Sequence, residues 1–135
     1  MKSILYRGGY KYQLVETYRV GITIRPAQTV VHDYITLDED GTLSIAAGYA
    51  WDGPSGPTFD TKDFMRGSLV HDALYQLMGD GLLPLSGREA ADATLRRICL
   101  EDGMSSIRAW WVYLGVRIGG GQAAASPEKK AEIAP

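Results

Sequence analysis

The hydrophobic period of the chain changes near Asp63, and this change constrains the fold more than any other feature of the sequence. Before it, short runs rich in β-branched and aromatic residues alternate with turn residues, a pattern typical of strands. After it, apolar residues recur with the period of about 3.6 residues that an α-helix requires. The sequence therefore predicts an α+β domain, with a sheet in its N-terminal half and helices in its C-terminal half.

Three segments of the N-terminal half are predicted as strands: residues 12–24, 29–37 and 42–50. The turn Asp38-Glu39-Asp40-Gly41 lies between the last two and is a hairpin signal. We therefore expect an antiparallel β meander.

Two helices that pack antiparallel are predicted next. The first begins near Asp63 and ends at Gly79, where Gly-Asp-Gly stops it. The second runs from Ser86 to about Glu101, with Ser86 as its cap and Glu89 at capping-box spacing. The apolar stripe of the first helix consists of Met65, Leu69, Ala73 and Leu77.

A third helix is predicted from Ser105 to about Ile118, and the glycines at 119–121 are expected to end it. Its apolar residues are Ile107, Trp110, Trp111, Leu114 and Ile118. We expect the tryptophan pair in the core, because this helix must bury one face, although an exposed pair would mark a partner surface. Residues 1–121 then form a single domain, followed by a flexible or partner-ordered tail at 122–135.

Composition narrows the class of protein. The chain has 135 residues, 45% of them hydrophobic and 22% charged, which suits one globular core rather than a disordered chain. A net charge of −2 and no basic patch argue against a nucleic-acid partner. Cys99 is the only cysteine, so no internal disulfide is possible. With no signal-peptide core and no apolar run near the roughly 18 residues of a membrane span, we expect no transmembrane segment and synthesis in the cytoplasm.

A cluster of polar side chains is predicted where the first two helices meet. His71 and Tyr75 share one face of the first helix, and Asp72 points about 100° away. In an antiparallel pair, Asp92 of the second helix could reach Nδ1 of His71 and the Tyr75 hydroxyl. It would then orient the imidazole and leave Nε2 to take a proton from water.

A purely structural interpretation of the same residues stays open. His, Asp and Tyr side chains can satisfy one another as a buried network that fixes helix register, with Arg66 and Arg88 as counter-ions. The Gly/Pro-rich segment after Asp52 is similarly ambiguous. It is either a crossover packed on Trp51 or a loop whose free oxygens, together with Asp72, suit Ca²⁺.

Four motifs resemble a phage- and prophage-borne family called domain of unknown function 1353. They are the turn at 48–57 (G-Y-A-W-D-G-P-S-G-P), H-D-A-L-Y at 71–75, R-E-A-A-D at 88–92 and V-R-I-G at 116–119. The resemblance implies a viral or prophage origin and says little about activity.

A second resemblance covers roughly residues 49–99 and is mechanistic. The run from Tyr49 to Tyr75 is similar to the calcium loop and H-D-x-C-Y helix of secreted phospholipases A2. The resemblance implies that His71 activates water while Asp92 and Tyr75 orient it. The implied calcium ligands are Asp72 and backbone oxygens at Trp51, Gly53 and Gly56. Ala73 and Leu74 stand where those enzymes carry cysteines, and the loop here is rich in proline.

Two functions from different classes follow. One is a Ca²⁺-dependent hydrolase of phospholipids or other acyl esters, with a His71–Asp92 dyad. The other is a non-enzymatic component of a phage particle, such as a tail, baseplate or capsid accessory protein bound to other phage structural proteins. A zinc site is disfavoured, because His32, His71 and Cys99 show no paired ligand spacing.

Overall fold

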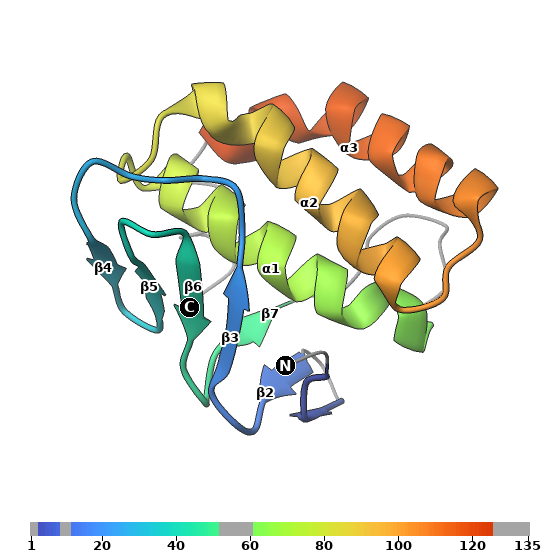
Figure 1. Cartoon of the computed structure of the whole chain (residues 1–135), viewed down its shortest axis with the longest axis horizontal. Coiled ribbons are helices and arrows are strands. Elements are labelled where there is room, and N and C mark those ends of the chain that lie inside the picture. Colours follow the sequence, from blue (N-terminus) through green and yellow to red (C-terminus); the bar gives the residue numbers. More distant parts are fainter. Residues whose placement is uncertain (1–2, 9–11, 52–60, 126–135) are drawn as a thin grey trace.

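The computed structural model describes residues 3–8, 12–51 and 61–125, with side chains described as far as residue 120. Two small antiparallel sheets lie on one side of the molecule and the helices on the other (Figure 1). The α+β fold predicted from the change of period is confirmed. Within the described residues, no helix has both the length and the apolar character to cross a membrane.

The strands are short and form two separate sheets. Their bounds are β1 Tyr6–Arg7, β2 Tyr12–Leu14, β3 Tyr18–Gly21, β4 Val30–His32, β5 Ile35–Leu37, β6 Thr42–Ile45 and β7 Ala50–Trp51. One sheet has the order β1-β2-β7 and the other the order β3-β6-β5-β4. The predicted meander is present in β4, β5 and β6, and the turn at 38–41 closes its second hairpin through a hydrogen bond from Gly41 N to Asp38 O.

The segment predicted as one strand at 12–24 is divided between the two sheets. Leu14 ends β2, which pairs with β7, whereas Tyr18 begins β3, which pairs with β6. Both side chains are buried in the main core. The break lets one sheet bury Leu14 and the other bury Tyr18. The local alternation of apolar and polar residues does not reveal where such a break occurs.

The predicted helix pair is confirmed. Helix α1 spans Lys62–Gly79 and α2 spans Arg88–Glu101, after a short 3₁₀ turn, η1, at Leu85–Gly87. They run antiparallel, and α3, Ser106–Ala125, lies along α2 on the outside of the helical layer (Figure 1).

Helix α1 is the centre of the molecule, because one side of it packs on the sheets and the other on α2 and α3. Its sheet-side residues belong to the main core, which includes Leu69, Val70, Ala73, Leu74 and Leu77. A second cluster fills the space between the three helices: Phe64, Leu95, Cys99, Met104, Ala109 and Val112. The close approach of α1 and α2 depends on Gly67, where a Cβ would stand 2.9 Å from Leu95 Cδ1 and 3.0 Å from Cys99 Sγ.

Two predictions about helix ends are wrong. Ser86 does not cap α2, because it lies inside η1; the N-cap residue is Gly87, with no side-chain hydrogen bond. The glycines at 119–121 do not end α3, which continues to Ala125. Gly120 packs so tightly on Tyr75 that a Cβ would lie 2.6 Å from the hydroxyl oxygen, so tertiary packing outweighs the weak helix propensity of glycine. The predicted tail therefore starts helical, and residues 126–135 lie outside the described part of the chain.

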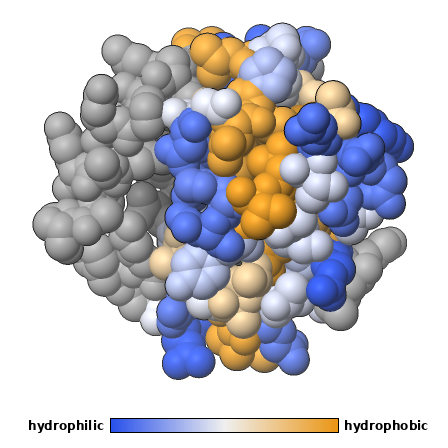
Figure 2. All heavy atoms as spheres, turned by 90° about the vertical axis from the view of Figure 1, so that its left-hand side faces the viewer, coloured by the Kyte–Doolittle hydropathy of each residue, from blue (hydrophilic) through white to orange (hydrophobic). Residues whose placement is uncertain are grey.

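The expected burial of the tryptophan pair is also wrong. Helix α3 faces the core with its small residues Ala109 and Val112, while Trp110 and Trp111 are exposed. A different apolar band lies at the end of the molecule that β4 and the connection between α1 and α2 share (Figure 2). The exposed large apolar residues of those segments are Val31, Leu82 and Leu85.

Candidate functional site

The helical pattern of the sequence brings the predicted polar residues together. His71 and Tyr75, one turn apart on α1, both face Asp92 in the N-terminal half of α2. Asp92 has no solvent exposure and lies among Ala91, Thr94 and Leu95, which are also buried. Because charge in such a place is costly unless it is fully partnered, the hydrogen bonds of Asp92 decide what the cluster can do.

Asp92 accepts hydrogen bonds on both carboxylate oxygens. Oδ1 is 2.7 Å from His71 Nε2 and 2.6 Å from the Tyr75 hydroxyl, and Oδ2 is 2.9 Å from Arg117 Nη1. The predicted meeting of these three helix residues is therefore observed, with one correction. The imidazole nitrogen that faces Asp92 is Nε2 and not Nδ1, so the edge of the ring that is farther from Cβ points toward the carboxylate.

The protonation states of this cluster follow from its contacts. Burial raises the pKa of Asp92, but hydrogen bonds from His71, Tyr75 and Arg117 outweigh it, so the net pKa lies below the ordinary value and the carboxyl group stays ionised. Burial and then the adjacent carboxylate raise the pKa of Tyr75, which stays a phenol donor. An ionised carboxylate only accepts hydrogen bonds, so the tautomer of His71 that fits this contact carries a proton on Nε2. The lone pair is then on Nδ1.

The imidazole ring is held on its face as well as on its edge. The centroids of the His71 and Tyr75 rings are 4.1 Å apart with an interplanar angle of 35°. His71 is 8% exposed, and its Nδ1 makes no hydrogen bond to any described residue. The ring therefore has a fixed orientation, and Nδ1 is the nitrogen that does not face Asp92.

Two arginines complete the cluster from α2 and α3. Arg88 donates from Nε to the Tyr75 hydroxyl at 3.2 Å and from Nη2 to the carbonyl oxygen of Arg117 at 2.6 Å. Its Nε is 4.0 Å from Asp92 Oδ2, so the predicted counter-ion role of Arg88 agrees with its position. Arg88 and Arg117 together neutralise much of the Asp92 charge and fasten α3 to the other helices.

The sequence pattern gives no role to Arg117, and the predicted place of Arg66 as a counter-ion of this cluster is wrong. Arg117 belongs to the V-R-I-G motif, and membership of this motif is the sequence feature that points to a role for Arg117. Arg66 instead donates to the Tyr18 hydroxyl at 2.6 Å and to Asp102 at 3.0 Å, one and a half turns from the site. The sheet and the C-terminal end of α2 provide those partners, and the sequence pattern around Arg66 does not encode either contact.

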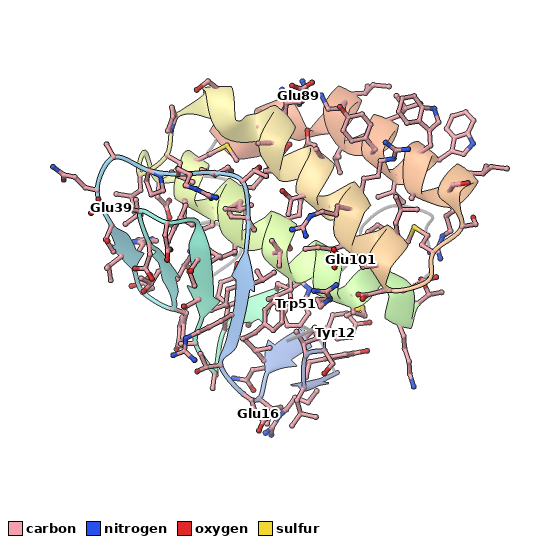
Figure 3. The ribbon with its side chains drawn as sticks, viewed as in Figure 1. Tyr12, Glu16, Glu39, Trp51, Glu89 and Glu101 are labelled. Atoms are coloured by element: carbon pink, nitrogen blue, oxygen red, sulfur yellow. The ribbon has the colours of Figure 1, made fainter. Side chains whose placement is uncertain are left out.

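The candidate calcium ligands are only partly within the described residues. Asp72 is half-buried on α1, and Gly53 and Gly56 lie outside the described residues. The side chain of Trp51 is fixed by its contacts: its Nε1 donates to Ser68 Oγ on α1 at 3.0 Å, and its ring centroid lies 5.8 Å from that of Tyr12 (Figure 3). These contacts do not involve the backbone oxygen that the calcium prediction uses. No group of three or more His, Cys, Asp or Glu side chains suited to a metal occurs in the part of the chain that the structure describes. The calcium site remains a prediction.

The fold and the site together define a small α+β domain built around a buried His–Asp–Tyr–Arg cluster. Residues 28–116 match the model of a family described as protein of unknown function (DUF1353), and the chain belongs to that family. The match includes His71, Tyr75, Arg88 and Asp92 and ends just before Arg117. Comparisons with curated proteins and with solved structures gave no match.

Proposed function

We propose that the protein hydrolyses acyl esters, with phospholipids as the substrate class and His71 as the general base. The observation that carries this proposal is the Nε2–Asp92 hydrogen bond of 2.7 Å, which places the lone pair of neutral His71 on Nδ1. A fixed tautomer with an available nitrogen is what base catalysis by histidine requires.

In the proposed reaction, Nδ1 of His71 takes a proton from a water molecule while the water oxygen attacks the ester carbonyl carbon. The imidazolium then returns the proton to the oxygen of the leaving alcohol as the carbon–oxygen bond breaks. Asp92 stabilises the imidazolium, and Tyr75 and Arg117 keep the carboxylate in place.

The proposal includes Ca²⁺ for two reasons: the resemblance to secreted phospholipases A2 and the chemistry of the candidate ligands. The carboxylate of Asp72 and backbone oxygens at Trp51, Gly53 and Gly56 are the hard oxygen ligands that Ca²⁺ prefers. When bound, the ion would balance negative charge on the ester carbonyl oxygen.

The proposal is tested by release of fatty acid from micellar phospholipid and of alcohol from a short-chain ester, with and without added Ca²⁺. We expect His71→Gln to reduce kcat by about 100-fold or more. His32→Gln changes the only other histidine, which pairs with Asp80 on another side of the molecule, and should leave the rate unchanged. Full activity in a folded His71→Gln variant, or no hydrolysis by the unmodified protein at any Ca²⁺ concentration, contradicts the proposal.

A second candidate function is a non-enzymatic component of a phage particle, made in the host cytoplasm. Two observations favour it: both oxygens of Asp92 are used by protein donors, as in a structural network, and α3 exposes a large apolar face. Its test is the protein content of purified particles. A fixed copy number per particle supports this function, and absence from particles that assemble normally contradicts it.

A further inference from the structure

Helix α3 has a second apolar face, opposite the one that it buries. At helical spacing, the apolar side chains at i, i+4, i+7 and i+11 from Ile107 line up on the outer side, with Trp110 at the border. We call this the outer α3 face, and it consists of Ile107, Trp110, Trp111, Leu114 and Ile118. The exposed fraction is 73% for Ile107, 67% for Trp111 and 86% for Ile118. A helix that is apolar on both sides needs something to cover its outer side.

A positively charged side chain without an ion-pair partner among the described residues borders this face. The guanidinium carbon of Arg96, on α2, lies 5.2 Å from the ring centroid of Trp110. Its Nε is buried without a hydrogen-bond partner, and Arg96 forms no ion pair with a described residue. Neighbouring arginines differ, because Arg97 pairs with Glu101 at 3.0 Å and Arg108 with Asp63 at 3.1 Å.

Arg96 also lines a groove between α2 and α3. The groove is open to solvent and has a volume of about 500 Å³; Leu100, Trp110 and Tyr113 contribute its apolar walls. Its lining also includes Arg97 and Glu101, which form an ion pair with each other at 3.0 Å. The 20 residues of α3 include no Asp or Glu, so the helix itself does not repel an anion. An apolar face, an aromatic border and an unpaired guanidinium therefore occur side by side.

We propose that the outer α3 face docks on the surface of a phospholipid membrane, with Arg96 contacting lipid phosphate. Tryptophan and aliphatic side chains on one side of a helix suit the boundary between head groups and acyl chains. The charge of Arg96 is complementary to phosphate. A second copy of the chain fits less well, because a stable protein interface involves about 20–30 residues on each side and this face is a single row. These residues lie outside the His71 cluster, so the docking proposal stands or falls independently of hydrolysis.

The experiment uses the full chain and vesicles of dialkyl-ether phosphatidylcholine, alone or mixed with dialkyl-ether phosphatidylglycerol. Ether lipids contain no acyl ester, so hydrolysis cannot contribute to the result. We expect the protein to sediment with the vesicles and its tryptophan emission to move to shorter wavelength. The Trp111→Ala/Ile118→Ala double variant should lower the partition coefficient by about tenfold or more. Arg96→Gln should weaken binding to the phosphatidylglycerol vesicles by about fivefold.

The matched control is Val31→Ala/Leu85→Ala, which removes two exposed apolar side chains that do not belong to the outer α3 face. It should bind like the unmodified protein. Absence of vesicle binding, or an equal loss in the control variant, overturns the proposal. So does a concentration-dependent dimer in sedimentation velocity that Trp111→Ala/Ile118→Ala abolishes, because a second copy would then be the partner of this face.

Discussion

Nε2 of His71 lies 2.7 Å from Oδ1 of Asp92, across the contact between α1 and α2. This hydrogen bond joins residues that are 21 positions apart and determines which imidazole nitrogen is basic. Asp92 also accepts hydrogen bonds from Tyr75 and Arg117, so the stability of the helical layer and the chemistry of His71 depend on the same carboxylate.

Asp92→Asn should lower the free energy of unfolding by about 3 kcal/mol, as removal of one partner from a buried ion pair generally does. The amide keeps the shape of the side chain but leaves the Arg117 charge without its counter-ion and places an NH₂ group against a hydrogen-bond donor. Urea unfolding followed by circular dichroism measures the change. Asp40→Asn, the same substitution in an exposed turn, should have a much smaller effect; equal losses would show that the Asp92 network contributes little.

The contribution of Asp92 should depend on pH. Its pKa in the folded protein is below the ordinary value of 3.8, so its stabilising effect is fully present above about pH 3.8. The effect is lost as the pH falls through the folded pKa. The difference in unfolding free energy between the unmodified protein and Asp92→Asn should therefore shrink as the pH falls below about 3.8. A difference that grows over that acidic range is inconsistent with an ionised Asp92.

Two glycine-to-alanine substitutions in helices should change the stability of the protein in opposite directions. Gly67→Ala forces a methyl group against Leu95 and Cys99 and should destabilise the protein by about 1–3 kcal/mol. A Cβ at Gly115 meets nothing within 4 Å, so Gly115→Ala should stabilise by up to about 1 kcal/mol through helix propensity. Melting temperatures of both variants give the comparison. If Gly67→Ala also stabilises, the close α1–α2 contact is not as described.

Cys99 should be unreactive in the folded protein. Burial, followed by the charges of Asp63 and Asp102, raises the pKa of its thiol to about 12, and the side chain has no solvent exposure. Alkylation by iodoacetamide at mildly alkaline pH, followed by mass spectrometry, should be slow in buffer and fast in urea. Similar rates in both conditions would mean that the space between α1 and α2 opens readily.

Part of the site could be predicted because it depends on local geometry. The i, i+4 spacing places His71 and Tyr75 on one face of any helix, and an antiparallel partner then brings Asp92 within reach. The choice between Nε2 and Nδ1 could not be predicted, since it depends on the rotamer that the packed ring adopts. The recruitment of Arg117 could not be predicted either, since it depends on how α3 packs against α1 and α2.

The sequence by itself determined where strands give way to helices, where α1 ends and which three residues of α1 and α2 meet. These features follow from periodicity and turn chemistry within a few neighbouring residues. Tertiary structure alone decided that residues 12–24 divide between two sheets, that Arg66 turns to Tyr18 and that α3 exposes its tryptophans. Each of these outcomes is a competition for buried space between segments far apart in the chain, and a local pattern carries no information about which segment occupies it.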